Sequence, residues 1–361
     1  MRKSCLELTT ELEALKELQG QFGQELTKAQ SLSPNKPEDL VLVRDIKFNL
    51  NQTLQDLQNE LWLDTPEFSE ENLKVQYDNQ IDILLKAHLI HPLSIGELGI
   101  QAIDNKEYPI PTLKQISEQL VEQKEFFETK IKQGFTKLIM IPFGLTLDSL
   151  TYAYSEALVE HHRQNKLFDV NNKHFPISEI QPNNRDQNYQ GKDQLVYFPK
   201  KFSKTNHQGK TKLELLPTQA WQVLLVEDLS NLPAEGRSQT LNGRKQLEAK
   251  TGKEPDWYLE QLQTNPQYQG EQGLTPESWI AYALTHLQTT NQFIDDIDAE
   301  LQIYSAASKV PCLLLSSFFV HDKSIPLVFF NRSNFEIRFT THKGVKDLIW
   351  PPGTRSAISV I

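Results

Sequence analysis

A change in hydrophobic spacing near residue 134 limits most strongly how this chain can fold. Before it, large apolar residues recur at steps of three and four, which is the heptad spacing of packed helices. After it, apolar residues come in short runs that end at proline or glycine, which is typical of buried strands. We therefore expect an α+β protein of two parts, an α-helical bundle or coiled-coil region over 1–133 and a mixed α/β domain over 134–361.

Two helices with heptad spacing are expected between residues 4 and 61. Each has one polar interruption, Gln19 in the first and Lys47 in the second, and the segment SLSPNKPED at 31–39 separates them. A short connection of this kind favours an antiparallel hairpin. The apolar stripe either mediates self-association or closes a self-contained bundle. Its members are Leu8, Leu12, Leu15, Phe22 and Leu26, then Leu40, Val43, Leu50, Leu54, Leu57 and Leu61.

Two further helices are predicted at 69–90 and 112–133, with an ordered connection between them. In the second part, the helix expected at 146–166 has Thr146 as its cap and Asp148 in its first turn. Another begins with Thr275 as cap and Pro276 at its first position. Shorter helices are expected at 244–250 and 255–263, a polar loop at 169–194, and strands at 136–141, 195–199 and 221–228.

The last 55 residues are expected to be all-β. Three strand candidates lie between 310 and 342, and the chain ends in a fourth, SAISVI at 356–361. In the third candidate, Phe335, Ile337 and Phe339 alternate with polar residues, so they are expected to face the core together.

Charge and cysteine content exclude several classes of function. The formal net charge is −10, which disfavours broad binding to nucleic acid or to anionic membranes. Two cysteines, Cys5 and Cys312, are too few for a disulfide framework or a structural zinc site. Glutamates interrupt the N-terminal segment, and no apolar run reaches the roughly 18 residues of a membrane helix, so a cytoplasmic location is expected.

Motifs for catalysis or metal binding are weak. Glu160, His161 and His162 are adjacent on a helix, where neighbouring side chains point about 100° apart and cannot share one metal. The segment GRSQTLNGRK at 236–245 does not have the spacing of a phosphate-binding loop, and no GxSxG occurs. Cys312 is interpreted as a buried, inert thiol. We therefore predict no catalytic residue, no cofactor and no metal.

An acidic group lies after the helix that begins at Thr275. It contains Asp295, Asp296, Asp298 and Glu300. The group lacks the glycine and the closing glutamate of an EF-hand loop. Two interpretations stay open, a calcium site and a solvated acidic loop.

Polar and aromatic residues interleave between 316 and 350, a composition that recognition surfaces use. An ordinary sheet face with loops explains the same pattern. If the segment binds a ligand, the residues expected to be displayed are His321, Asp322, Asn331, Arg332, Asn334, Arg338 and His342.

Several segments of the second part resemble a known family. They are GFTKLIMIPFG (134–144), WQVLLVEDLSNLPAEG (221–236), GRKQLEA (243–249), YQGEQGLTPESWIAYALTHLQTTNQFIDD (268–296), YSAASKVPC (304–312) and GTRSAISVI (353–361). They are similar to proteins of candidate-phylum bacteria that resemble variable target proteins of diversity-generating retroelements. The link to those targets rests mainly on Gly353, Arg355, Ala357 and Val360.

The resemblance implies a C-type-lectin-like domain of the formylglycine-generating-enzyme type, with a long insertion at about 167–270. Strand 136–141 would pair with 356–361, and 310–350 would supply a variable recognition face for a protein or a small ligand. This chain differs in having Phe and Ser where the family has Trp and Arg. Two alternatives stay open: a helical assembly protein whose second part is purely structural, and a diverged oxidoreductase, which would need a paired-cysteine copper site.

Overall fold

The computed structural model divides the chain into two compact units, Met1–Asp64 and Thr65–Ile361. The predicted helices between 4 and 61 lie outside the residues that the structure describes. The boundary expected at 133/134 is wrong, because the helices before it belong to the second unit. The described residues are 69–167, 195–228, 254–297, 311–331, 336–342 and 353–361, with the backbone of 184–185, 240–241 and 244–245.

The second unit opens with helices and a small sheet. Helix α3 begins after Ser69, whose side chain accepts a hydrogen bond from the amide of Asn72. The expected ordered connection forms the three-stranded sheet β1-β2-β3. The helix predicted at 112–133 is two helices, because the backbone leaves helical geometry at Gln123. The elements are α3 (Glu70–Lys86), β1 (His91–Pro92), β2 (Leu98–Gln101), β3 (Glu107–Pro109), α4 (Leu113–Glu122) and α5 (Lys124–Lys132).

An antiparallel sheet in the order β10-β17-β7-β4 forms the centre of the unit. The expected pairing of 136–141 with 356–361 is wrong, because β7 lies between these strands: Leu225 pairs with both Leu138 and Ile358. An uninterrupted apolar strand is covered on both faces, which suits a central position. The strands are β4 (Phe135–Ile141), β7 (Gln222–Glu227), β10 (Glu271–Gly273) and β17 (Ser356–Ser359).

The position of β7 also corrects the expected insertion at 167–270. That segment contains the central strand, so the part around 222–227 is integral to the fold. Of the helix predicted near 244–250, residues 244–245 instead form a strand, and the remainder lies outside the described residues. Other elements of this segment are β5 (Asn184–Arg185), β6 (Leu195–Tyr197), α7 (Lys212–Gln219), β8 (Thr240–Leu241), β9 (Arg244–Lys245) and α8 (Pro255–Thr264).

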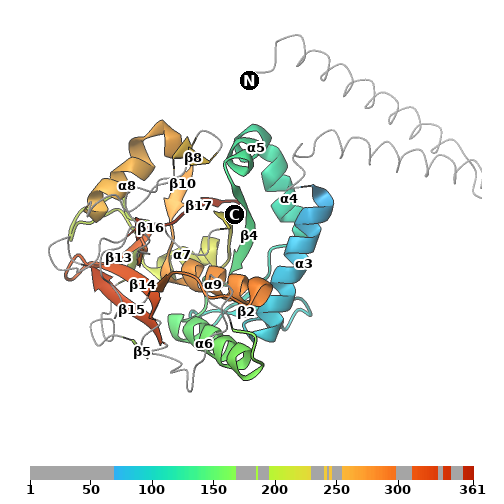
Figure 1. The fold of residues 1–361 in the computed structure, drawn as a ribbon. Helices are drawn as coiled ribbons and strands as arrows, with labels where there is room; N and C mark the ends of the chain where they lie inside the picture. Colours follow the sequence, from blue (N-terminus) through green and yellow to red (C-terminus); the bar gives the residue numbers. More distant parts are fainter. Residues whose placement is uncertain are drawn as a thin grey trace, which may run out of the picture. The chain divides into compact units, whose positions relative to one another are not determined.

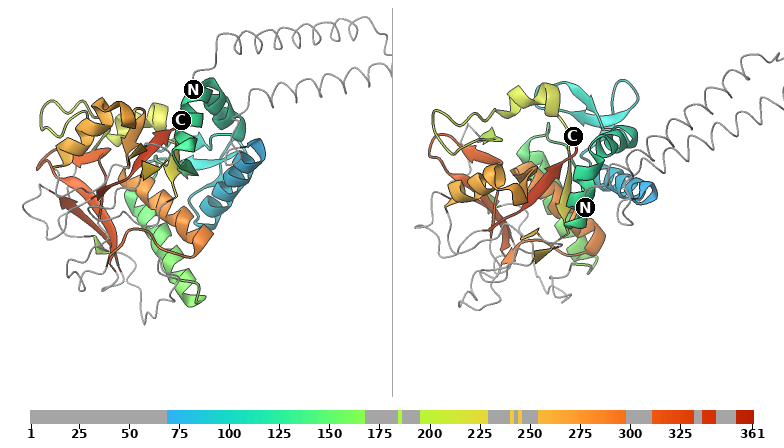
Figure 2. Two further views of the ribbon diagram at one scale, coloured as in Figure 1. Left: turned by 45° about the horizontal axis from the view of Figure 1, so that its top comes forward. Right: turned by 90° about the horizontal axis from the view of Figure 1, so that it is seen from above.

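Two long helices pack together beside the central sheet (Figures 1 and 2). Helix α6 (Leu147–Arg163) is capped by Thr146, and α9 (Pro276–Thr290) by Thr275, as predicted. Every residue of α9 from Pro276 to Leu287 is buried. The rings of Tyr154 on α6 and Trp279 on α9 meet edge to face, with centroids 6.0 Å apart.

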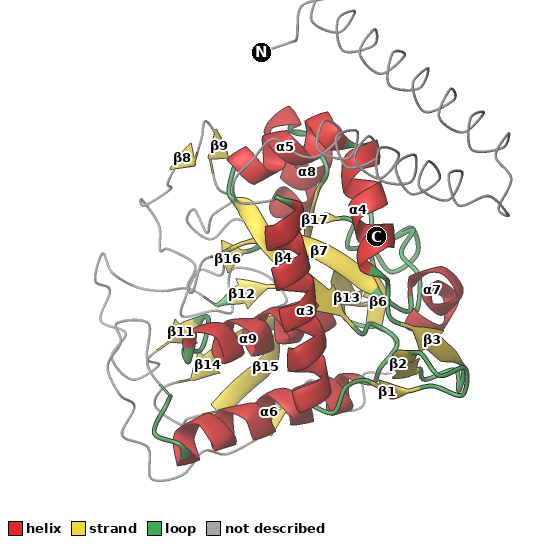
Figure 3. Cartoon of the chain, turned by 90° about the vertical axis from the view of Figure 1, so that its right-hand side faces the viewer, coloured by secondary structure: helices red, strands yellow, loops and turns green. Residues whose placement is uncertain are grey.

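A second sheet, in the order β16-β12-β14-β15-β5, contains most of the C-terminal strands (Figure 3). The all-β prediction is confirmed for the described part of this region. Ile337 and Phe339 are both buried, as the alternation predicted. The remaining strands are β11 (Asp296–Ile297), β12 (Cys312–Leu313), β13 (Ser317–Phe319), β14 (Ile325–Asn331), β15 (Glu336–His342) and β16 (Gly353–Thr354). The described second unit is therefore α+β, and none of its helices is long and apolar enough to cross a membrane.

Candidate functional site

The residues predicted to form a display surface have different environments. His321 is exposed and Asp322 is half-buried, in the turn that joins β13 to β14. His342 is 1% exposed, so its side chain belongs to the core and the expectation that it is displayed is wrong. It occupies the last position of β15, opposite the buried Ile325. Side chains of the other four lie outside the described residues: Asn331, Arg332, Asn334 and Arg338.

The register of β14 and β15 separates these residues along the strands. Ile325 pairs with His342 at one end, and Asn331 pairs with Glu336 at the other. Six strand steps lie between the two ends, a distance of about 20 Å. The turn with His321 therefore lies at the opposite end of the pair from Asn331 and Glu336. The described residues among the seven do not converge on a single point.

The turn at 320–323 is held by its own side chains. The carboxylate of Asp322 accepts hydrogen bonds from the backbone amide of Ser324 (3.1 Å) and from its hydroxyl (2.6 Å). The amide of Phe319 donates to the carbonyl of Ser324 (2.8 Å), which closes the hairpin. Lys323 adopts a left-handed backbone conformation, with φ of +58°. Asp322 thus stabilises the turn, while His321 and Lys323 are exposed.

Asp295 has a structural role that the sequence did not suggest. Its carboxylate is completely buried and accepts hydrogen bonds from Nη2 of Arg355 (2.6 Å), from Nε of Arg355 (3.1 Å) and from the Trp279 indole (2.7 Å). Burial disfavours the charged guanidinium, but the Asp295 carboxylate, together with smaller effects of Tyr282 and Cys312, outweighs burial and raises the pKa of Arg355. Both Asp295 oxygens are engaged, so neither the calcium interpretation nor the solvated loop fits this residue. Asp298, Glu300 and the side chain of Asp296 lie outside the described residues.

Two more buried ion pairs stabilise neighbouring parts of the unit. Lys130 on α5 lies 3.0 Å from Glu271 on β10, and Ser356 donates to the other oxygen of that carboxylate (2.6 Å). Lys212 on α7 lies 2.7 Å from Glu277 at the start of α9. Their partners are far apart in sequence, so no local spacing could have predicted them.

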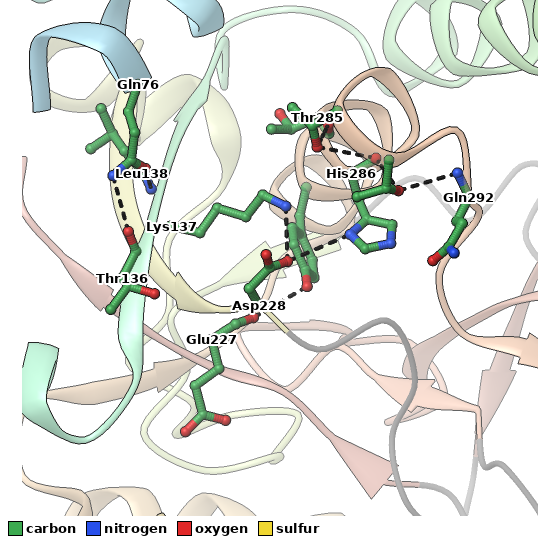
Figure 4. Close-up of polar contacts among 12 residues, drawn as sticks. Gln76, Thr136, Lys137, Leu138, Glu227, Asp228, Thr285, His286 and Gln292 are labelled. Carbon is green, nitrogen blue, oxygen red and sulfur yellow. Dashed lines mark hydrogen bonds and ion pairs between the residues drawn. The ribbon is translucent and has the colours of Figure 1, made fainter. Parts of the chain in front are cut away.

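A fourth polar group, around Asp228, is partly open to solvent and is shown in Figure 4. Asp228, at the end of β7, accepts a hydrogen bond from Nζ of Lys137 on β4 (2.8 Å). Nδ1 of His286 on α9 is 3.6 Å from the same oxygen. The side chain of Asp228 is 53% exposed, whereas that of His286 is 5% exposed. His286 and Lys137 hold the pKa of Asp228 well below its usual range. Burial lowers the pKa of His286, and Asp228 offsets part of that effect.

A histidine beside a carboxylate is the arrangement of a general base, but no described hydroxyl or thiol is hydrogen-bonded to the His286 ring. Cys312 is completely buried and burial raises its pKa, so the expected burial is confirmed and the inertness of the thiol stays a prediction. Nδ1 of His161 donates to the carbonyl of Ala157 (2.7 Å). Among the residues that the structure describes, no three His, Cys, Asp or Glu side chains gather as metal ligands would.

Comparisons of the chain with protein-family models, with curated proteins and with solved structures find no match. The family resemblance noted in the sequence is therefore an expectation that no matched protein tests. Function is inferred from the positions of the residues themselves.

Proposed function

We propose that this chain is a non-catalytic cytoplasmic binding protein that recognises a protein or a small ligand through segments at the ends of β14 and β15. The observation that carries the proposal is the turn at 320–323. Two exposed side chains, His321 and Lys323, project from a hairpin whose following strand is buried from Ser324 to Phe330. Substitutions at such exposed positions leave the supporting core unchanged, which is the general logic of recognition loops on rigid scaffolds.

The buried ion pair gives this scaffold its rigidity. Arg355 lies between β16 and β17, and Asp295 immediately precedes β11, which pairs with β14. A guanidinium held by two hydrogen bonds to a buried carboxylate fixes these strands relative to α9. Loops attached to strand ends that are fixed in this way are already ordered before a ligand binds. Binding then costs less conformational entropy, which favours association.

The resemblance to variable target proteins supports the same function, because those proteins diversify a ligand-binding face. We propose that the unit 65–361 contains a diverged C-type-lectin-like fold in which β7 separates β4 from the last strand, β17. Self-association is proposed for residues 4–61, where heptad spacing is the signal. Sedimentation of the full chain beside residues 65–361 tests it: a smaller assembly for the shorter chain supports the proposal.

The test of recognition is capture of a partner from native lysate by four forms of the full chain. These are the unmodified protein, His321→Ala with Lys323→Ala, Arg332→Ala with Asn334→Ala, and a control with Lys74→Ala and Lys86→Ala on the exposed face of α3. Thermal melts first establish that all four are folded.

Loss of a partner with the first pair alone places recognition at the 320–323 turn. Loss with the second pair alone places it at the opposite strand end. Equal capture by all four forms contradicts recognition at either end of β14 and β15.

A further inference from the structure

A loop with high positive charge follows β6 in this acidic protein. Between Phe198 and Thr211, called here the lysine loop, the chain carries Lys200, Lys201, Lys204, His207 and Lys210 and no carboxylate. The whole chain has a formal net charge of −10. Positive charge is therefore concentrated in one short segment of a protein whose net charge is negative.

Contacts to the core hold the lysine loop in one conformation. The backbones of Tyr197 and Lys210 exchange two hydrogen bonds (2.8 and 3.0 Å), and the amide of Lys200 donates to the carbonyl of His207 (2.8 Å). Phe202 is buried, and its ring meets that of Phe318 with centroids 5.5 Å apart. The loop is thus an ordered part of the unit.

Backbone conformation in the lysine loop requires this support. Phe198 and Gln208 both lie in the left-handed region, with φ of +53° and +56°. Residues other than glycine adopt such angles only where surrounding contacts compensate for the strain, and they are enriched at functional segments.

No lysine of the loop forms an ion pair with a carboxylate in the described part of the chain, although Lys210 attracts the nearby Glu214. Lys200, Lys201, Lys204 and Lys210 are all exposed, and none lies within ion-pair distance of a described Asp or Glu. The adjacent Lys212 differs, because it is paired with the buried Glu277 at 2.7 Å. Glu214 is near, but its carboxylate accepts hydrogen bonds from Thr211 in the capping box of α7. Four like charges within one short loop repel one another, so an anionic partner would lower the free energy of this surface.

The composition of the surface selects among anionic partners. It has lysine but no arginine, so it lacks the planar fork that binds phosphate in two places. Phe202 and Phe318 are buried and cannot serve as stacking platforms for nucleic-acid bases. Leu213, two residues after the loop, has 59% of its surface exposed. A single apolar side chain beside a basic surface fits a polypeptide interface better than insertion into a bilayer.

We propose that the lysine loop and Leu213 bind an acidic polypeptide segment that carries an apolar residue beside its carboxylates. This surface is separate from the 320–323 turn, and the proposal does not rest on recognition there.

The test measures binding of the full-length chain to a fluorescent Asp- and Glu-rich peptide that contains one leucine, by anisotropy. The loop variant carries Lys→Glu at 200, 201, 204 and 210. Its control carries the same change at the exposed Lys74, Lys86, Lys114 and Lys166, so both variants have the same net charge. We expect the loop variant to lose at least about tenfold in affinity and the control to lose less than about threefold, with binding weaker at higher salt.

A third variant tests the apolar contact. Leu213→Asn is expected to weaken binding of the leucine-containing peptide and to leave binding of an all-acidic peptide unchanged. If the loop variant and the control lose the same amount of affinity for the peptide, the loss is explained by net charge alone and the proposal is overturned. Tighter binding to single-stranded DNA or to anionic phospholipid vesicles than to the peptide, at the same salt, would overturn the choice of partner. Circular dichroism melts verify that each variant is folded.

Discussion

Gln80 on α3 accepts a hydrogen bond from the backbone amide of Met140 on β4 at 3.1 Å, and so covers part of the free edge of the central sheet. Gln76, one turn earlier, accepts from the amide of Leu138 (2.8 Å) and donates to the carbonyl of Thr136 (3.1 Å; Figure 4). Gln76 and Gln80 are four residues apart, a rise of about 6 Å along a helix. Leu138 and Met140 are two residues apart, about 7 Å along a strand, so the spacing of the two glutamines matches that of the backbone amides at the free edge of β4. A helix here replaces the missing neighbour of an edge strand.

Removing these amides is expected to destabilise the unit. Gln80→Ala leaves the buried Met140 amide without its acceptor, which we expect to cost roughly 1–3 kcal/mol in the free energy of unfolding, and Gln76→Ala a similar or smaller amount. Urea denaturation measures both. Asn79→Ala, on the exposed face of the same helix, is the control and should change stability by less than about 0.5 kcal/mol. Equal effects at positions 79 and 80 would mean that the edge contact contributes nothing.

Two fragments test where the folded unit begins. Residues 65–361 retain α3 and are expected to unfold cooperatively, as a single domain does. Residues 134–361 lack α3, α4 and α5, which exposes the outer edge of β4 and removes the Lys130 partner of Glu271. We expect this shorter fragment to aggregate or to show no cooperative melt. A cooperative melt of 134–361 would restore the domain boundary that the hydrophobic spacing first indicated.

Arg355→Met is expected to destabilise the protein strongly, because it leaves the Asp295 carboxylate buried without its cation. Breaking one partner of a buried pair costs about 3–5 kcal/mol. Asp295→Asn removes the charge and keeps a residue that tolerates the left-handed backbone at this position (φ +50°). The double variant should lose less than the sum of the single losses, and urea denaturation of all four forms measures the difference. Additive losses would contradict a direct interaction.

Acid is expected to weaken the fold through His286. Its pKa is lowered in the folded state, mainly by burial and also by Lys137 and Arg355, while Asp228 opposes the shift. Near this pKa, the unfolded chain therefore binds more protons than the folded chain. The contribution of neutral His286 to the free energy of unfolding is present above the usual histidine pKa of about 6.5, and it is lost as pH falls below that value. Asp228, whose pKa is also lowered, adds a second loss below about pH 4.

The measurement for this pH dependence compares the protein with His286→Gln by urea denaturation across pH 5 to 8. The two forms differ only at position 286, so the difference between their profiles reports on that residue. We expect the stability of the unmodified protein to fall more steeply below about pH 6.5. Parallel profiles would show that His286 does not titrate differently on folding.

Cys312 is expected to resist thiol reagents in the folded protein. It is completely buried, and burial raises its pKa, so reactive thiolate is scarce. Cys5→Ser leaves Cys312 as the sole thiol, and its rate of modification is compared in buffer and in denaturant. Modification in buffer at the rate of a free thiol would show that strand β12 opens readily.

Elements with local signals were predictable from the sequence. Helix α9 begins where Thr275 and Pro276 predicted, and β4 occupies the apolar run before Pro142. The helix predicted at 112–133 was divided instead, because periodicity does not register a break at a residue such as Gln123. In the candidate site, sequence pattern identified polar residues along β14 and β15 but not the burial of His342.

Sequence alone determined the type of the elements with strong local signals, such as α9 and β4, because caps, prolines and apolar periodicity act over a few residues. Tertiary structure decided which strands pair and which charges meet. Arg355 and Asp295 are 60 residues apart in the chain, and Lys130 and Glu271 are 141 apart. Such pairs depend on strand order, and strand order depends on how β7 is covered on both faces. The apolar run of β7 indicates burial on both faces, but no local pattern encodes which strands lie on either side of it, so only the folded structure reveals that order.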